Sequence, residues 1–210
     1  MKEYKKLLLS NKAWASERIH VDENYFENLS KDQKPLFLWI GCADSRVPAE
    51  EITHADPGEI FVHRNVANMV VHTDINLLSV LQYAVEVLEV KHIIVCGHYN
   101  CGGVRAAMTN TDYGLINKWL RNIKEVYEKH FDELTSIENE QTRFNKLVEL
   151  NVEEQIKNLA KTTIVQKAWG NRSFPHLHGW VFDIHHGEIK EVLNINAGEW
   201  QSPVFSYDFK

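Results

Sequence analysis

Short, continuous runs of apolar residues recur along the chain and predict strands that are buried on both faces. The first run, residues 36–40, follows Pro35 directly, and two similar runs lie at 59–63 and 92–96. An apolar run without polar alternation is typical of a strand in a parallel sheet, because such sheets are covered on both faces. The pattern therefore predicts a parallel sheet at the centre of the fold.

A helical repeat separates the second and third of these runs. Between residues 74 and 88 the apolar positions recur every three or four residues, and Asp74 is a residue type that commonly begins helices. The order strand, helix, strand predicts a βαβ unit. Two more helices are predicted, at 117–131 and 140–159. A late hairpin is predicted from strands at 180–184 and 189–195, and its last strand should lie antiparallel at the sheet edge.

The N-terminal residues are predicted to form two helices, over 3–15 and 22–30. The first has apolar side chains at helical spacing, namely Tyr4, Leu7, Leu8 and Trp14. No apolar partner lies nearby in the sequence, so packing against a second subunit and packing on the same domain are equally open. The expected fold class is α/β: a mostly parallel sheet with an antiparallel edge strand, flanked by helices. We expect one domain over 1–210, with a helical arm at 1–34 and an α/β core at 35–210.

Charge and cysteine content exclude several classes of protein. The net charge is −6 and no basic run is present, which argues against nucleic-acid binding. No apolar stretch approaches the ~20 residues that cross a bilayer, and none resembles a signal peptide. The three cysteines, Cys42, Cys96 and Cys101, are too few for a disulfide framework and suit a reducing compartment. A cytoplasmic protein without nucleic-acid or membrane partners is expected.

Two polar segments follow predicted strands directly and carry the candidate chemistry. The first reads Cys-Ala-Asp-Ser-Arg from Cys42, and the second reads His-Tyr-Asn-Cys-Gly-Gly from His98. The carboxyl ends of parallel strands meet at one edge of a sheet, where binding sites form. Thiolate and imidazole are ligands that zinc prefers, and three of them leave a fourth position open, as in catalytic sites. Spacing alone leaves metal binding and ordinary core packing about equally open.

The remaining cysteine and histidines are expected to be structural. Cys96 lies inside an apolar run and is interpreted as a core residue. His176 and His178 have a spacing that metal ligands also use, and His185 and His186 adjoin the predicted turn. No cysteine or acid is arranged near either pair as a further ligand, so a core, turn or surface role is favoured.

Together these motifs resemble the signature of the β-class carbonic anhydrases. That signature is Cys-x-Asp-x-Arg at Cys42, followed far downstream by His-x-x-Cys-Gly-Gly at His98. The flanking Phe-Leu-Trp-Ile-Gly, Val-Pro-Ala-Glu, His-Arg-Asn-Val-Ala-Asn and Leu-His-Gly-Trp segments are similar to those of bacterial members. The resemblance extends from about residue 10 to 185.

The resemblance implies a zinc enzyme that reversibly hydrates carbon dioxide to bicarbonate and a proton. Cys42, His98 and Cys101 would bind one Zn²⁺ per chain, with zinc-bound hydroxide attacking carbon dioxide. Asp44 would orient that hydroxide, and Arg46 would hold Asp44 away from the metal. The family also implies a homodimer, or a dimer of dimers, in which the N-terminal helices embrace the partner.

The resemblance also implies a substrate pocket. Gln33 matches a residue that donates a hydrogen bond to the substrate oxygen, and Gly102 belongs to the matched His-x-x-Cys-Gly-Gly motif. Phe61, Val66 and Tyr83 match an apolar wall around the substrate, although the residue types by themselves favour plain core packing.

Two further hypotheses concern pH and regulation. Zinc with two thiolates carries no net charge and lowers the pKa of bound water less than a site made only of imidazoles, so activity should rise toward alkaline pH. Trp39, Val47 and Arg64 match a bacterial subset in which bicarbonate binds a separate pocket and Asp44 then occupies the metal's fourth position. This chain has Phe182 where that subset commonly carries tyrosine, which weakens the expectation.

Three rival functions remain open on the sequence. A hydrolase of carbon disulfide or carbonyl sulfide would share the ligands and differ in pocket access. A zinc-binding sensor would not need Asp44, Arg46 and Gln33 together. A cysteine hydrolase using Cys42 or Cys101 would require a free thiolate and would tolerate chelators.

Overall fold

The structure is a computed structural model that describes residues 2–209, so the outermost residues of the expected 1–210 domain lie outside it. The chain forms two compact units, which meet between Lys34 and Pro35. Each unit is described by itself. Among residues 2–209, none of the helices combines the length and the apolar character that crossing a bilayer requires.

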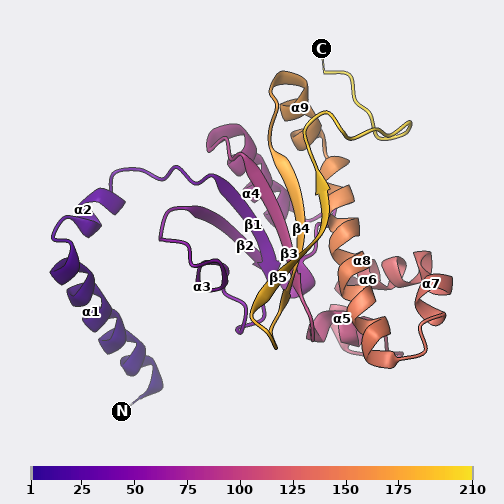
Figure 1. The fold of residues 1–210 in the computed structure, drawn as a ribbon, viewed down its shortest axis with the longest axis horizontal. Coiled ribbons are helices and arrows are strands. Elements are labelled where there is room, and N and C mark those ends of the chain that lie inside the picture. Colours follow the sequence, from indigo (N-terminus) through magenta and orange to yellow (C-terminus); the bar gives the residue numbers. More distant parts are fainter. Residues whose placement is uncertain (1, 210) are drawn as a thin grey trace. The chain divides into compact units, whose positions relative to one another are not determined.

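The second unit is built on one five-stranded sheet in the order β2-β1-β3-β4-β5 (Figure 1). The strands are β1 (Phe37–Cys42), β2 (Ile60–Asn65), β3 (His92–His98), β4 (His176–Asp183) and β5 (Glu188–Ile195). The first three pairings are parallel, and β5 runs antiparallel to β4 at the edge. The predicted α/β class, with a mostly parallel sheet and an antiparallel edge strand, is confirmed.

Each of the three strands that the apolar runs predicted extends two residues beyond its run. The runs end at 40, 63 and 96, whereas β1, β2 and β3 end at Cys42, Asn65 and His98. Glycine and polar residues break the apolar pattern there, but the ladder continues through Gly41 beside Arg64 and Gly97 beside Val181. As a result, Cys42 and His98 are the last residues of their strands.

The predicted helix over 74–88 is correct at its start and interrupted in its second half. Asp74 is its N-cap, because its carboxylate accepts hydrogen bonds from the backbone N–H groups of Asn76 and Leu77. Helix α4 ends at Gln82, and the next turn, η2 (Tyr83–Val87), is a π-helix. There the N–H of Leu88 donates to the carbonyl of Tyr83, five residues earlier. The apolar period does not distinguish this wider turn from an α-turn.

Helices cover the sheet, and α8 is the longest of those described in this unit (Figure 1). Its side chains contact the strands closely, since a Cβ placed on Gly97 of β3 would lie 2.7 Å from a methyl group of Val152. The helical elements of this unit are α3 (Ala49–Thr53), η1 (Val66–Asn68), α4 (Ile75–Gln82), η2, α5 (Gly102–Ala107), η3 (Gly114–Ile116), α6 (Asn117–Lys129), α7 (Phe131–Thr135), α8 (Glu140–Ala160) and α9 (Thr163–Asn171).

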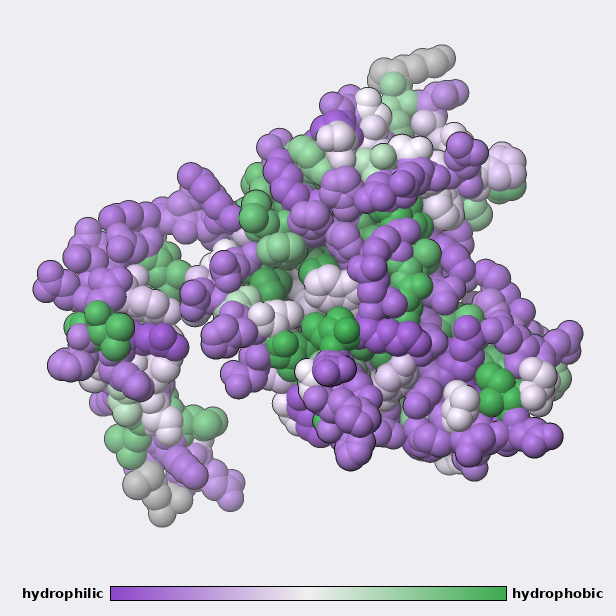
Figure 2. All heavy atoms as spheres, viewed as in Figure 1, coloured by the Kyte–Doolittle hydropathy of each residue, from purple (hydrophilic) through white to green (hydrophobic). Residues whose placement is uncertain are grey.

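The first unit consists of α1 (Glu3–Val21) and α2 (Tyr25–Leu29), so its first helix is longer than predicted. Trp14 packs edge-on against Phe26, with ring centroids 5.5 Å apart. Neither helix has a buried residue, and Leu7 is 73% exposed. On the face drawn in Figure 2, hydrophilic residues predominate on both units, and hydrophobic patches are visible on each of them.

Candidate metal centre

Three predicted ligands converge at the carboxyl edge of the sheet. Cys42 ends β1, His98 ends β3, and Cys101 directly precedes α5. Their ligand atoms all lie within 4.8 Å of one another, and each residue is buried. Within residues 2–209, these three form the single such cluster of three or more His, Cys, Asp or Glu side chains.

The two sulfurs are spaced for a shared metal ion. Cys42 Sγ and Cys101 Sγ are 3.9 Å apart, and both cysteines are free. A disulfide would bring the sulfurs to about 2.0 Å. Two sulfurs that each lie about 2.3 Å from a tetrahedral zinc ion are separated by about 3.8 Å. The observed separation therefore fits a tetrahedral zinc ion.

The imidazole of His98 is held in the tautomer that a metal requires. Its Nδ1 lies 2.9 Å from the backbone carbonyl oxygen of Tyr99, which can only accept, so Nδ1 carries the proton. The lone pair is therefore on Nε2, which is buried and has no hydrogen-bond partner. A buried, unpartnered acceptor is costly unless a cation uses it. His98 thus fits a zinc ion as well as the two sulfurs do.

The two cysteine sulfurs shift each other's pKa in opposite directions. A hydrogen bond from Cys101 lowers the pKa of Cys42, and contacts from His98 and from the backbone N–H groups of Asp44 and Ala67 lower it further against the effect of burial. The pKa of Cys101 is raised by the same bond and by burial. A divalent cation would favour the thiolate form of both residues.

Asp44 lies beside this cluster and is held by Arg46 through two parallel hydrogen bonds. Arg46 Nε donates to Oδ1 at 2.9 Å and Nη2 donates to Oδ2 at 2.7 Å. The guanidinium therefore holds the pKa of Asp44 well below its usual range, with the coulombic effect of His98 as a smaller cause. Asp44 Oδ2 is 3.8 Å from His98 Nε2. A permanently charged carboxylate thus lies next to the candidate metal position.

Arg64 connects the loops around the first cysteine. Its Nε donates to the carbonyl of Cys42 at 2.8 Å, and its Nη2 donates to the carbonyl of Asp44 and, at 3.4 Å, to that of Val47. Trp39 is buried, and its indole Nε1 has no hydrogen-bond partner. The three residues of the predicted bicarbonate pocket therefore lie on β1, on β2 and in the loop after Cys42, with two of them in direct contact.

The residues of the predicted substrate pocket lie in different places. Phe61 and Tyr83 contact each other, with ring centroids 5.8 Å apart. Val66 directly follows β2, and Gly102 begins α5, one residue after Cys101. Gln33 belongs to the first unit, where its backbone N–H donates to Asp32. Their roles in binding substrate remain predictions.

The other expected structural residues are placed as predicted. Cys96 is buried, and burial raises the pKa of its thiol. His178 pairs with His92 and with Asn194, at 2.9 and 3.0 Å. His186 is exposed at the turn and pairs with Asp183 at 2.8 Å.

Polar residues on the buried face of α8 are absent from the predicted site. Asn151 and Gln155 are buried at positions where the apolar stripe of this helix faces the core. The signal available in the sequence was the pair of amides, four residues apart, inside that stripe. These side chains bind the segment that follows β2, which lies against Cys42.

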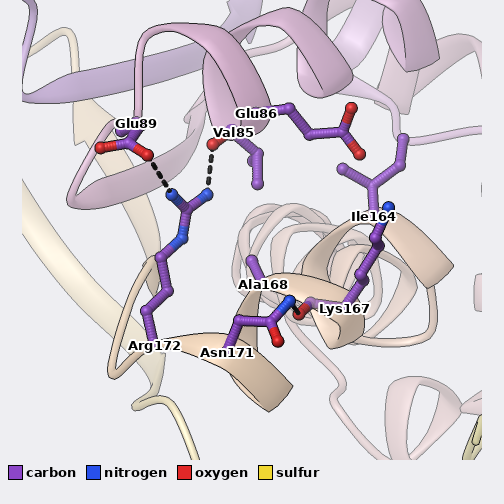
Figure 3. Close-up of a pocket in the computed structure, with 8 residues that line it drawn as sticks. All are labelled: Val85, Glu86, Glu89, Ile164, Lys167, Ala168, Asn171 and Arg172. Carbon is purple, nitrogen blue, oxygen red and sulfur yellow. Dashed lines mark hydrogen bonds and ion pairs between the residues drawn. The ribbon is translucent and has the colours of Figure 1, made fainter. Parts of the chain in front are cut away.

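A cavity of about 460 Å³ lies between η2 and α9 (Figure 3). Arg172 spans it, donating to the carboxylate of Glu89 and to the carbonyl of Val85. None of the residues that line this cavity belongs to the cysteine–histidine cluster. The cavity is therefore separate from the candidate metal centre.

Comparison with known proteins identifies relatives of this chain. A family model described as carbonic anhydrase matches residues 37–189. A carbonic anhydrase of Emericella nidulans is 52% identical over 191 residues, covering 91% of this chain and 83% of that protein.

Solved structures give the same result. A tetrameric β-carbonic anhydrase from Sordaria macrospora matches with a TM-score of 0.89 and 41% identity, covering 93% of this chain and 100% of that one. The Coccomyxa β-carbonic anhydrase in complex with acetazolamide matches with a TM-score of 0.88 and 38% identity, covering 94% of this chain and 90% of that one.

Proposed function

This chain belongs to the β-class carbonic anhydrase family, and from that premise we propose that it reversibly hydrates carbon dioxide to bicarbonate and a proton. The observation that carries the proposal is the buried convergence of two sulfurs with an unpartnered imidazole nitrogen. The substrates that we propose are carbon dioxide and bicarbonate.

One Zn²⁺ per chain is the cofactor that the donor set favours. Cys42, His98 and Cys101 would hold it, which leaves one position of a tetrahedral ion free. Zinc would supply Lewis acidity there, which would lower the pKa of water and so favour attack on carbon dioxide, increasingly as the pH rises. The backbone N–H groups of Gly103 and Val104 stabilise negative charge on Cys101, as those of Asp44 and Ala67 do on Cys42.

Asp44 and Arg46 are proposed as the catalytic pair. Because Arg46 keeps Asp44 ionised, Asp44 can accept a hydrogen bond from the attacking oxygen and fix its orientation. The same two-point contact holds the carboxylate away from the metal position. Phe61, Val66 and Tyr83 would form the apolar wall, with Gln33 and Gly102 near the substrate oxygen.

The direct test is stopped-flow hydration of carbon dioxide by protein of known metal content, beside the Cys42→Ser variant. We expect zinc at one per chain and hydration far above the buffer rate in the original protein, and loss of both in the variant. Parallel assays with carbon disulfide and carbonyl sulfide distinguish the rival hydrolase. A zinc-loaded protein that hydrates carbon dioxide no faster than buffer would contradict the proposal. A rate that stays flat from mildly acidic to alkaline pH would contradict the expected alkaline rise.

Regulation by bicarbonate is the finer part of the proposal. The support is that Arg64 binds the carbonyl of Asp44, so an anion that drew Arg64 away would loosen the loop that carries Asp44. The unpartnered Nε1 of Trp39 offers a further donor. Phe182 supplies a ring but no hydroxyl at the position where tyrosine was expected. Inhibition by bicarbonate beyond product competition is expected, and its absence would remove the switch.

A homo-oligomer is proposed as the working form. The support is the Sordaria macrospora relative, which is a tetramer. The apolar side chains of α1, which have no buried partner in their own unit, suit a surface that another subunit covers. Light scattering of the full chain tests this proposal, and a monomer at micromolar concentration would contradict it.

A further inference from the structure

The segment Asn65–Val70 has an unusual backbone conformation. Ala67 and Asn68 have φ values of 63° and 50°, although neither is glycine. Left-handed backbone at such residues costs free energy and persists only where surrounding contacts enforce it. Both residues are buried, at 0% and 1% exposure, so solvent does not supply these contacts.

This segment contacts all three loops that carry the candidate ligands. Asn65 pairs with Cys42 in the ladder between β1 and β2, and its carbonyl accepts a hydrogen bond from the N–H of Ala43 at 2.8 Å. A Cβ placed on Gly103, two residues after Cys101, would lie 2.9 Å from Val66 and 3.2 Å from Ala67. A Cβ placed on Gly97, which precedes His98, would lie 3.4 Å from the side-chain oxygen of Asn68. A shift of the segment would therefore move the backbone beside each of the three candidate ligands.

Amide side chains of α8 hold the segment in place. Asn151 Nδ2 donates to the carbonyl of Ala67 at 3.3 Å, and Gln155 Oε1 accepts from the N–H of Val70 at 2.8 Å. Gln155 Nε2 donates to Asn151 Oδ1 at 3.1 Å, which joins the two side chains. Asn158 Nδ2 donates to the carbonyl of Val70 at 3.2 Å. These residues form an amide ladder, defined as Asn151, Gln155 and Asn158.

Each amide of the ladder needs a particular orientation, because Asn151 donates a hydrogen bond to the segment and Gln155 accepts one from it. The carbonyl of Ala67 needs a donor and the N–H of Val70 needs an acceptor, and the bond between Asn151 and Gln155 fixes both orientations at once. An apolar residue of the same size would fill the space and leave both backbone groups buried without partners. The arrangement is therefore specific to amides.

We propose that Asn151 and Gln155 are positioning residues of the metal centre, acting through the Asn65–Val70 segment on the strand ends and loops that carry the ligands. Without these amides the segment would shift, and the two sulfurs and the imidazole nitrogen would no longer meet at distances that suit one ion. Partners in this outer layer of metal sites affect metal affinity by about 10–100-fold. The inference rests on the proposed zinc site and assigns the residues that shape it.

The test compares Gln155→Met with Ile156→Ala in the full chain. Gln155→Met keeps the length of the side chain and removes its hydrogen bonds. Ile156 is the next residue on α8, and it faces Gly179 of β4, where its Cγ1 would lie 3.1 Å from a Cβ. Ile156→Ala therefore destabilises the same helix without touching the amide ladder, which makes it the matched control.

Two readouts separate positioning from simple stability. Zinc affinity is measured by competition with a chelator, and the sulfur environment is measured by the charge-transfer absorption of the cobalt-substituted protein. For Gln155→Met we expect zinc affinity to fall about 10-fold or more and the absorption band to shift. For Ile156→Ala we expect an unchanged band and zinc affinity within about twofold, although it unfolds more easily.

The result that overturns the inference is a Gln155→Met protein with the zinc affinity and band of the original. An equal loss of zinc affinity in Gln155→Met and Ile156→Ala would also overturn it, because lower stability alone would then explain the loss. If Gln155→Met does not fold, Asn158→Leu serves instead, because it removes the donor to the carbonyl of Val70 together with longer contacts to Gln155 and Lys161. It should give a smaller change of the same kind, and no change would count against the inference. Failure of the original protein to bind zinc or cobalt would instead overturn the proposed function.

Discussion

The two ends of the central sheet both gather metal-ligand residue types, but only one end forms a site. At the carboxyl end, the ligand atoms of Cys42, His98 and Cys101 lie within 4.8 Å of one another. At the amino end, His92 begins β3 and His176 begins β4, with their rings 5.4 Å apart. These residues and His178, termed the histidine group, form no cluster of metal-ligand atoms within the described chain.

The difference lies in where the lone pairs are directed. In the histidine group, His92 Nδ1 pairs with His178 Nε2 at 2.9 Å, and His178 Nδ1 pairs with Asn194 at 3.0 Å. His176 Nδ1 is buried without a partner, but it belongs to no cluster of converging ligand atoms. Phe37 stacks on His92 and closes that side, with ring centroids 5.3 Å apart. In the metal centre, His98 donates the proton on Nδ1 to a backbone carbonyl, which leaves Nε2 without a hydrogen-bond partner. A metal site therefore requires free, converging lone pairs and not merely suitable residue types.

The largest expected effect compares one histidine from each end. His98→Gln should lower zinc affinity by more than about 100-fold, because loss of a ligand exceeds the 10–100-fold effect of an outer partner. His178→Gln should keep zinc at one per chain, since its nitrogens are occupied by His92 and Asn194. Metal analysis after dialysis against a chelator measures both. If the two variants lost zinc equally, the contrast between the ends would be wrong.

The next effect concerns the charged pair beside the metal centre. Asp44→Asn should lower kcat/KM for carbon dioxide hydration by about 100-fold, because the attacking oxygen would lose the acceptor that fixes its orientation. Zinc content should stay the same, since Asp44 pairs with Arg46 and is not in the ligand cluster. Asp183→Asn, which removes an acid paired with exposed His186, is the control and should keep full activity. An Asp44→Asn enzyme with undiminished kcat/KM would remove the proposed role.

A smaller effect tests how tightly the backbone is packed at the metal end. Gly103→Ala should destabilise the protein by about 1–3 kcal/mol, because its Cβ would lie 2.9 Å from Val66 and 3.2 Å from Ala67. Gly102→Ala should be neutral or stabilising by up to about 1 kcal/mol, since nothing lies within 4 Å of its Cβ and alanine favours helix. Urea unfolding of both variants measures the difference. Equal stabilities would show that this end is packed more loosely than the structure indicates.

The smallest effect concerns the pH dependence of stability at the amino end. Burial, followed by the neighbouring His178 and His176, lowers the pKa of His92. The unfolded chain therefore binds a proton that the folded protein resists, so this group reduces stability as the pH falls below about 6.5. Replacing it in His92→Phe should make the decline in stability from pH 7.5 to 5.5 shallower, as measured by urea unfolding.

His186, whose pKa is shifted in the opposite direction from that of His92, provides the control for this measurement. Its hydrogen bond to Asp183 raises the pKa of His186, so the pair stabilises the folded protein at low pH, and that contribution is lost as the pH rises through the raised pKa. His186→Gln should therefore make the acid decline steeper. If the original protein and His92→Phe lost stability equally between pH 7.5 and 5.5, protonation of His92 would not destabilise the folded state, and the prediction would be wrong.

Much of the fold was predictable because burial leaves a continuous apolar run in β1 and β3, and a shorter one in the edge strand β2. The runs located β1, β2 and β3 correctly and ended two residues early, since Gly41 and Gly97 carry no hydrophobic signal. The hydrogen-bonded ladder, and not side-chain polarity, sets the true end of each strand. The π-turn at Tyr83–Val87 was missed for a related reason, because its bonding differs while its apolar spacing does not.

The sequence alone indicated which residues could meet as ligands, because Cys42 and His98 closely follow two apolar runs that predict parallel strands. Only the tertiary structure made those strands neighbours and decided which histidine nitrogen converges with other ligand atoms, since the partner of His92 lies 86 residues away along the chain. The same holds for the left-handed turn at Ala67, which depends on Asn151, 84 residues away. Local periodicity records burial, whereas the direction of a hydrogen bond depends on neighbours that folding brings together.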